Sequence, residues 1–250
     1  MSLKDKVAIV TGGSRDIGKA VSLQLAAGGA KVVVNYHNNA AHGAETVKEI
    51  TDAGGTAIAV AGDMTKAADV ANLVAESVKA FGDKVDILVN VVGGLVARKS
   101  LEDMDEEFFD HVMKLNVNSV FLAMKNVVPL MGDGGSVVNL SSLAGRDGGG
   151  PGAVAYATSK GAIMTFTRGM AKELGPKNIR VNCVCPGMIS TTFHDEFTKD
   201  EVRKNVAAGT PLRREGQANE VANLVTYLAS SESSFLTGTS VDINGGLAFS

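Results

Sequence analysis

Short runs of β-branched and aliphatic residues alternate along the chain with longer segments in which apolar residues recur every three or four positions. The short runs predict seven strands, at 6–11, 31–36, 56–62, 85–92, 135–142, 179–185 and 239–245. The longer segments predict helices at 17–27, 40–53, 67–81, 106–131, 159–174 and 218–230. Because parallel neighbours need connections of this length, the pattern indicates an α/β fold, a doubly wound and mostly parallel sheet with helices on both faces.

No Pro/Ser-rich linker, charge block or internal repeat interrupts this alternation, and residues 1–250 are therefore predicted to form a single domain. With 250 residues, 45% of them apolar, the chain has ample material for a buried core. Its longest nearly unbroken apolar stretch, 87–97, contains Asn90 and two glycines, and is too short to cross a bilayer. The first residues lack a signal-peptide pattern, so we expect a cytoplasmic protein with no membrane partner.

Charge and cysteine usage exclude several further classes. A net charge of −3 gives no broad basic field, so a nucleic-acid partner is not expected and a small molecule is. Cys183 and Cys185 are separated by one residue, a poor spacing for a disulfide, and are predicted to be buried as small apolar side chains. The four histidines include no HExxH pair, so no catalytic metal is expected.

Glycines gather at the ends of the predicted strands, which places them at one edge of a parallel sheet. The first strand runs into TGGSRDIGKA, where Gly12, Ser14, Arg15, Ile17 and Gly18 are candidate contacts of a dinucleotide pyrophosphate at the start of the next helix. The same segment matches most of a P-loop, GxxxxGK. Ala20 then stands where a P-loop needs a magnesium-binding hydroxyl, which disfavours a nucleoside triphosphatase.

The ends of the second and third strands bear on the choice of dinucleotide. NAD-binding proteins usually place a carboxylate after the second strand, where this chain has Asn35. Asn35 would tolerate the extra phosphate of NADP and Arg15 could pair with it, so NADP(H) is predicted as the preferred cofactor and NAD(H) as the alternative. Arg15 as a merely solvated side chain stays open. Asp63 could accept a hydrogen bond from the adenine amino group, or serve only in a turn.

Three residues carry the candidate chemistry. Tyr156 and Lys160 are four positions apart and share one helix face, and Ser142 is the last residue of the fifth predicted strand. Reduction of a carbonyl leaves negative charge on oxygen, which needs a hydrogen-bond donor and then a proton. We expect Ser142 to hold the oxygen and Tyr156 to give the proton, its pKa lowered toward neutrality by the Lys160 ammonium together with the nearby charge of the nicotinamide. A YxxxK pattern alone also occurs by chance.

Taken together, these motifs resemble the short-chain dehydrogenase/reductase family over nearly the whole chain. They occur in the family order: TGGSRDIG, AGDMT, NVVGG, KLNVNSVF, SS before YATSK, RVNCVCPG and TGTSVDINGG. The resemblance implies a Rossmann-type fold, a homotetramer and a catalytic tetrad of Asn116, Ser142, Tyr156 and Lys160. Lys160 would also bind the nicotinamide ribose, and Asn116 would anchor a proton-relay water. It further implies cofactor contacts at Asn90, Pro186, Gly187, Ile189 and Thr191.

The chain departs from the family pattern in three places. Asp16 replaces the usual middle glycine of the cofactor turn, and Val91 and Val92 replace Asn-Ala of the family's NNAG. The interval from Ser142 to Tyr156 is one residue longer than usual. We expect the glycine-rich loop between them to absorb that residue and leave both hydroxyls in place.

The carbonyl substrate is less well defined. Arg98, Lys99 and Arg146 could line the substrate mouth with positive charge, which would suit a small polar ketone or aldehyde such as the keto sugar acid 4-deoxy-5-hexoseulose uronate, with Arg146 on its carboxylate. The alternative is a 3-oxoacyl-[acyl-carrier-protein] reductase, although Asp133 stands where carrier docking would favour a basic residue. A nucleotide-sensing protein without turnover is a third reading. Residues 189–210 are predicted to form a substrate lid.

Overall fold

A computed structural model describes residues 2–249, and their backbone forms the predicted seven-stranded sheet. Its order is β3-β2-β1-β4-β5-β6-β9 and every neighbouring pair is parallel. The order reverses beside β1, and open α/β sheets bind ligands at such a switch point, beyond the carboxyl ends of the strands. The strands are β1 (Val7–Thr11), β2 (Lys31–Tyr36), β3 (Thr56–Ala61), β4 (Ile87–Asn90), β5 (Ser136–Leu140), β6 (Arg180–Pro186) and β9 (Ser240–Ile243).

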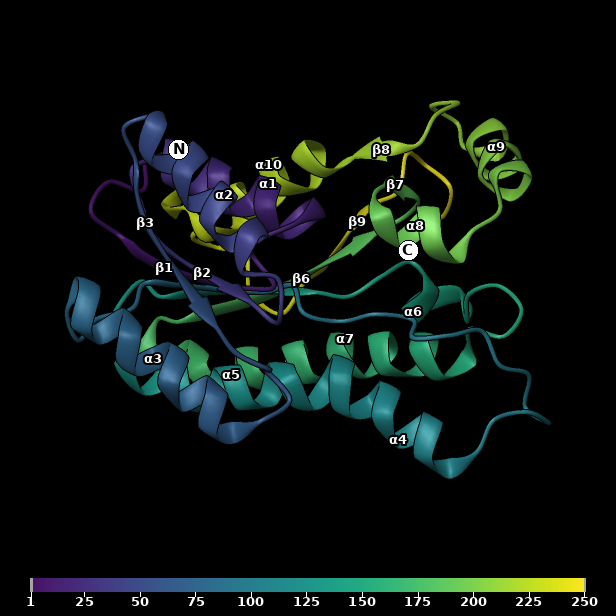
Figure 1. The fold of residues 1–250 in the computed structure, drawn as a ribbon, viewed down its shortest axis with the longest axis horizontal. Helices are drawn as coiled ribbons and strands as arrows, with labels where there is room; N and C mark the ends of the chain where they lie inside the picture. The colour runs from purple at the N-terminus through teal and green to yellow at the C-terminus, as the bar shows by residue number, and fades with distance from the viewer. Residues whose placement is uncertain (1, 250) are drawn as a thin grey trace.

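Helices cover both faces of this sheet, which confirms the predicted fold class (Figure 1). One face carries α1 (Asp16–Ala27), α2 (Ala40–Asp52) and α10 (Ala218–Ala229). The other carries α3 (Ala67–Phe81), α4 (Glu106–Met113), α5 (Ser119–Val127) and α7 (Val154–Leu174). Successive residues of β1 alternate between the two cores: Ala8 and Val10 pack toward α1, and Val7 and Ile9 toward α3. Strands buried on both faces explain the nearly continuous apolar runs in the sequence.

The long helix predicted at 106–131 is interrupted. After α4 the backbone forms a π-helical segment, Lys114–Asn118, before α5 begins at Ser119. A 3-10 turn, Val128–Leu130, then ends the helix, and similar turns occupy Gly175–Lys177 and Ser231–Ser233. Single π turns often mark functional sites because they re-aim one side chain, here Asn116. The helix predicted at 159–174 begins earlier, at Val154, so that Tyr156 lies in its first turn.

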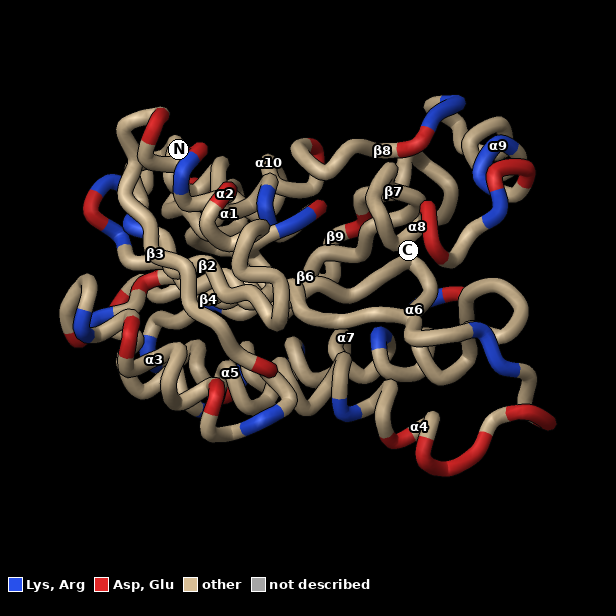
Figure 2. Tube along the Cα trace, viewed as in Figure 1, with Lys and Arg blue, Asp and Glu red and all other residues tan. Residues whose placement is uncertain are grey.

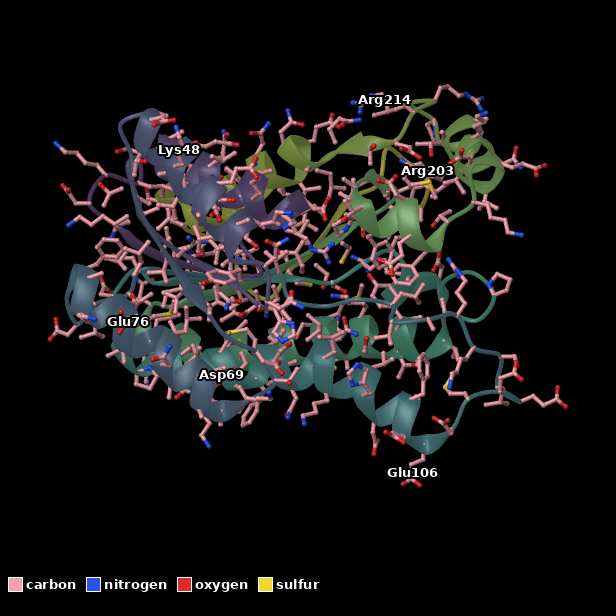
Figure 3. All side chains as sticks on the ribbon, in the orientation of Figure 1. Lys48, Asp69, Glu76, Glu106, Arg203 and Arg214 are labelled. Atoms are coloured by element: carbon pink, nitrogen blue, oxygen red, sulfur yellow. The ribbon has the colours of Figure 1, made fainter. Side chains whose placement is uncertain are left out.

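The segment predicted as a lid forms small elements at the carboxyl edge of the sheet (Figure 1). They are β7 (Ile189–Ser190), which pairs with β8 (Gly216–Gln217), and the helices α8 (Thr192–Phe197) and α9 (Asp200–Gly209). Arg203 on α9 holds them together (Figure 3). Its guanidinium donates two hydrogen bonds of 2.7 Å to the Glu215 carboxylate before β8 and another to Asp195 on α8. A further short helix, α6 (Ala144–Asp147), precedes the glycine-rich loop.

The distribution of charged residues and the burial of the thiols are consistent with a protein that binds a small molecule. Figure 2 shows both signs of charge interspersed over the molecule. The Cys183 and Cys185 thiols are free and fully buried on β6, beside Met164. Residues 2–249 contain no cluster of His, Cys, Asp and Glu side chains that could hold a metal ion. Among the helices of the same residues, none has the length and apolar character required to cross a membrane.

Candidate active site

A cavity of about 980 Å³ opens at the carboxyl ends of the strands. It is at the upper end of the roughly 300–1,000 Å³ range of small-molecule sites. The turn after β1 and the connection from β2 to α2 form one half of its wall. Ser142, Tyr156, Lys160 and residues of α8 form the other. The cavity therefore joins the two groups of residues that the sequence analysis singled out separately.

The glycine positions of the turn after β1 have no room for a side chain. Gly12 has φ of +63°, and a Cβ on Gly18 would lie 2.0 Å from the Gly12 carbonyl oxygen. Asn35, only 1% exposed, fastens this turn: its Oδ1 accepts a 3.0 Å hydrogen bond from the Gly12 N–H, and its Nδ2 donates to the Gly62 carbonyl at 3.1 Å. The Asn35 amide is thus committed to the backbone of two neighbouring segments, and it brings no negative charge to this part of the cavity.

The neighbouring wall is formed by residues that the sequence analysis did not single out. The end of β2, the connection after it and the first turn of α2 contribute Tyr36, His37, Asn38 and His42. Their position at and directly after the end of the second predicted strand is the sequence signal that could have identified them. Arg15, which the sequence analysis did identify, lines the cavity beside them with a 62% exposed side chain. No carboxylate occurs from residue 35 to residue 39. An anionic group could therefore approach this part of the wall without repulsion from the end of β2.

Asp63 lines the same half of the cavity. Its Oδ1 accepts hydrogen bonds from the Thr65 N–H at 3.0 Å and the Thr65 hydroxyl at 2.7 Å. Burial by itself raises the pKa of Asp63, but these hydrogen bonds and the nearby His37 and Lys66 lower it below the usual value. Asp63 is therefore an ionised acceptor at the cavity edge.

Asn90 lies elsewhere than expected. It is 2% exposed and its Nδ2 donates to Oδ1 of Asn139 on β5 at 2.8 Å. Asn139 in turn donates to the Thr167 hydroxyl on α7 at 3.0 Å. Asn90 does not belong to the cavity wall. Its place as the last residue of β4, facing β5, makes it a link within the sheet rather than a cofactor contact.

Ser142, Tyr156 and Lys160 lie together in the other half of the cavity. Lys160 is 4% exposed, and its Nζ donates a 2.8 Å hydrogen bond to the Leu140 carbonyl and lies 5.7 Å from the centre of the Tyr156 ring. Burial lowers the pKa of Lys160 to about 8, so the ammonium remains mostly charged at neutral pH. A buried cation thus faces the phenol.

The side chains of the protein alone do not lower the pKa of Tyr156. Burial raises its pKa, and the hydrogen bond with Ser142 only partly offsets this. The protein's own side chains therefore do not bring this pKa toward neutrality. The desolvation that favours the neutral phenol is larger than the effect of the polar groups around it.

Asn116 lies directly behind this group. It is fully buried; its Oδ1 accepts from the Gly94 N–H at 3.0 Å and its Nδ2 donates to the Gly94 and Val112 carbonyls. A Cβ on Gly93 would lie 2.5 Å from Asn116 Oδ1 and 3.0 Å from Lys160 Nζ. The π-helical turn therefore brings the Asn116 amide beside the Lys160 ammonium, with only the bare Gly93 backbone between.

The segment after β6 closes the cavity between its two halves. Its wall there contains the predicted nicotinamide contacts, Pro186, Gly187, Ile189 and Thr191. A Cβ on Gly187 would lie 2.8 Å from the side chain of Asn244, so only glycine fits between these segments. The Thr191 hydroxyl donates to the Ile189 carbonyl at 3.1 Å.

The expected cluster of positive charge at the substrate mouth is not formed. Arg146 lies outside the cavity wall and donates to Asp242 Oδ1 and to the Ser240 carbonyl, both at 2.7 Å. Arg98 lines the cavity, but its guanidinium donates to the carbonyls of Phe197 and Pro151. Arg146 thus ties α6 to β9, and local sequence spacing could not show that partner.

An aromatic group missed in the sequence covers Tyr156 instead. The Phe193 ring on α8 lies 5.9 Å from the Tyr156 ring, centre to centre, and Phe197 lies 5.3 Å from Phe193. Leu143 and Val206 complete an apolar wall on this side. The longer loop before α7 is accommodated by glycines with positive φ at 148, 149 and 152, and both hydroxyls, of Ser142 and Tyr156, face the cavity.

Comparison with known proteins agrees with this arrangement. A family profile described as "Enoyl-(Acyl carrier protein) reductase" matches residues 12–248. The chain is 38% identical to an uncharacterized oxidoreductase of Methylorubrum extorquens, over 98% of each protein. It is 34% identical, with a TM-score of 0.94 and complete coverage of both chains, to a short-chain dehydrogenase/reductase from Serratia marcescens.

Two further solved structures have names that state a cofactor. A blue fluorescent protein from a metagenomic library, in complex with NADPH, is 33% identical with a TM-score of 0.93 and full coverage of both chains. An NADH-dependent reductase described as responsible for alginate metabolism is 34% identical with a TM-score of 0.90, over 99% of each chain. Both nicotinamide cofactors therefore occur among proteins of this fold and similarity.

Proposed function

Because the chain belongs to the short-chain dehydrogenase/reductase family, and is thus an NAD(P)-dependent oxidoreductase, we propose that it uses NADPH to reduce the carbonyl group of a small-molecule ketone or aldehyde. One observation carries the proposal. Ser142, Tyr156 and the buried Lys160 ammonium share a cavity wall with the glycine turn after β1. Hydroxyl donors and a proton source thus line the same cavity as the candidate dinucleotide site.

The residues of the second half would handle the carbonyl oxygen. Ser142 and Tyr156 donate hydrogen bonds to it, and Tyr156 then transfers its proton as negative charge develops there. The Lys160 ammonium, with its Nζ 5.7 Å from the centre of the Tyr156 ring, would stabilise the tyrosinate that remains. The nicotinamide cofactor, when bound, supplies the hydride. Asn116, with its amide held by Gly94, keeps the Lys160 end of this group in place.

The first half would hold the dinucleotide. The glycines at 12, 13 and 18 let this turn pack tightly at the start of α1, where backbone N–H groups suit a pyrophosphate. Asp63 would accept from the adenine amino group. At the other end, Lys160 would bind the nicotinamide ribose. The segment after β6 would hold the carboxamide, through Pro186, Gly187, Ile189 and Thr191.

The preference for NADP(H) rests on Arg15 and on the absence of a carboxylate from residue 35 to residue 39. We expect Arg15→Ala to raise the KM for NADPH about 10- to 100-fold, the effect of losing hydrogen bonds between charged groups, and to leave the KM for NADH nearly unchanged. Initial rates with each cofactor measure this. Arg168→Ala removes an exposed arginine on α7 and serves as the control. Equal changes in the KM for both cofactors in Arg15→Ala would contradict the role of Arg15 in binding the extra phosphate of NADPH.

The substrate end favours a neutral carbonyl compound with an apolar body. Phe193, Phe197, Leu143 and Val206 line it, whereas Arg146, which was to bind the carboxylate of a keto sugar acid, is paired with Asp242. NADPH oxidation with neutral aryl and alkyl ketones, a keto-uronate and an acetoacetyl thioester tests this choice. We expect the largest kcat/KM for a neutral ketone.

Each other outcome of the same panel has a definite meaning. A many-fold preference for the thioester would replace the proposal with 3-oxoacyl reduction. A preference for the keto-uronate would support a keto sugar acid as the substrate, as the sequence analysis suggested. Tight NADPH binding with no oxidation by any carbonyl compound would contradict a reductase function.

A further inference from the structure

Asp16, the first residue of α1, contacts a distant part of the molecule. Its Oδ1 accepts a 3.0 Å hydrogen bond from the Thr192 N–H, and its Oδ2 accepts a 2.5 Å hydrogen bond from the Thr192 hydroxyl. Thr192 is the first residue of α8, and 176 positions separate the two residues. Both carboxylate oxygens are thus used on one residue, which fixes an orientation as well as a distance.

We propose that Asp16 is a positioning residue that fastens the start of α8 to the cofactor turn and thereby places the Phe193 wall over the carbonyl substrate beside Tyr156. Phe193 follows Thr192 directly, and its ring lies 5.9 Å from the Tyr156 ring. The proposal deepens the proposed function and rests on it for the identity of the two ligands. The contact itself would couple a ligand bound at the turn after β1 to a ligand bound beside Phe193, whatever the identity of the two ligands.

Arg15 completes the contact. Its Nη1 donates a 2.9 Å hydrogen bond to the Thr192 hydroxyl oxygen and lies 3.6 Å from the Asp16 carboxylate. The hydroxyl therefore accepts from Arg15 while it donates to Asp16. Arg15 also balances the negative charge that Asp16 introduces beside a candidate phosphate site.

Other contacts hold the far parts of the same region. Arg98 donates to the Phe197 carbonyl at the end of α8, and Arg203 joins α9 to Asp195 and Glu215. The loss of the Asp16 contact should therefore loosen the first turn of α8, which carries Thr192 and Phe193, and leave α9 attached. This makes the expected effect local and measurable.

The backbone of Asp16 separates this role from a structural one. Its φ is +50°, a left-handed conformation that glycine adopts without strain and aspartate does not. Asp16→Gly relieves this strain but loses the hydrogen bonds to Thr192, and the two effects on stability oppose each other. Asp16→Gly should therefore change thermal stability little while it weakens substrate binding. A purely structural residue would change both in the same direction.

The chain offers a matched control. Asp5, in the turn before β1, also has positive φ, of +63°, and is exposed outside the cavity wall. Asp5→Gly makes the same chemical change at a similar backbone conformation. Asp16→Asn retains an acceptor for the Thr192 N–H, and Thr192→Val removes the hydroxyl with little change in volume.

The experiment compares these variants by steady-state kinetics and by hydrogen exchange of amides 191–209 with and without NADPH. For Asp16→Gly we expect the carbonyl KM to rise about tenfold, the effect of losing hydrogen bonds to a charged group. The NADPH KM should stay unchanged or fall, because a negative charge near the phosphates is removed. Exchange should quicken at 191–195 but not at 200–209. Asp16→Asn should be intermediate, and Asp5→Gly should match the parent protein.

Thr192→Val should reproduce part of the effect and add nothing to Asp16→Gly, because both changes remove the same contact. Parent-like exchange at 191–195 in Asp16→Gly, or an equal change in Asp5→Gly, would overturn the proposal. Exchange and melting temperature need no turnover. If the parent protein reduced no carbonyl compound but Asp16→Gly still loosened 191–195, the proposed function would fail and the contact would stand.

Discussion

At the scale of single residues, Lys160 combines a charge with nearly complete burial. Its pKa falls from 10.5 to about 8 because the folded site disfavours the charged form. Between these two values the unfolded chain binds a proton that the folded protein does not, so stability should rise with pH over that range. Below pH 8 the buried charge lowers the free energy of unfolding. In the proposed function, Lys160 serves the chemistry at the expense of stability.

Lys160→Met tests this assignment. It removes the charge, keeps an unbranched apolar stem, and gives up the hydrogen bond to the Leu140 carbonyl. At about 1.4 kcal/mol per pKa unit, less the lost hydrogen bond, we expect the free energy of unfolding at pH 7 to increase by about 1–2 kcal/mol. This advantage over the parent protein should shrink above pH 8 and be lost by pH 10, where the missing hydrogen bond outweighs what remains of the charge penalty. Urea denaturation at both pH values measures it, and a less stable variant at pH 7 would contradict the assignment.

The sequence identified residues whose chemistry is intrinsic, and missed those defined by a distant partner. Ser142, Tyr156 and Lys160 follow from the needs of carbonyl reduction and from one helix face. Asn35 and Arg146 were assigned to ligands. In the structure, the Asn35 amide accepts a hydrogen bond from the Gly12 N–H, and the Arg146 guanidinium donates one to Asp242. Arg146 and Asp242 are 96 positions apart, and no periodicity or local motif relates them.

At the scale of elements, Arg180 at the start of β6 serves the end of helix α10. It is 7% exposed and donates to the carbonyls of Leu228 and Ser230 and to the Ser233 hydroxyl. The last carbonyls of a helix lack intrahelical donors, and a cation there also interacts favourably with the negative end of the helix dipole. A buried polar link therefore joins the central sheet to one of its covering helices.

We expect Arg180→Leu to lower the free energy of unfolding by about 2–4 kcal/mol, because it leaves these buried acceptors without a charged donor. Guanidinium denaturation followed by circular dichroism measures the loss. Arg168→Leu, on the exposed side of α7, is the control and should change stability by less than about 0.5 kcal/mol. A similar small change in both variants would show that this link contributes little.

The hydrophobic pattern predicted the strands closely because burial on both faces leaves a continuous apolar run. It did not predict the π-helical turn at Lys114–Asn118, since one extra residue in a helix barely alters the apolar spacing on either side. The small elements β7, β8 and α8 were also missed as separate units. They are too short for any period to define, and distant contacts such as those of Arg203 hold them in place.

At the scale of the whole molecule, the strand order explains why two separate sets of residues form one site. The reversal of order between β2 and β4, on either side of β1, opens a crevice at the carboxyl edge, and the strands on both sides deliver their following loops into it. Alternating strands and helices made this topology predictable. The contacts of α8 with the turn after β1 were not, because they depend on how the segment after β6 folds back. The homotetramer implied by the family resemblance stays a prediction.

The central claim is that Tyr156 donates the proton in NADPH-dependent carbonyl reduction, and one comparison tests it most directly. Tyr156→Phe removes only the hydroxyl and keeps the ring that packs against Phe193. NADPH oxidation by the parent and the variant should be measured with the best ketone of the panel, together with NADPH binding by fluorescence. The account predicts a loss of turnover of about 1,000-fold or more with the NADPH Kd changed less than about threefold. Comparable turnover in the two proteins would contradict it.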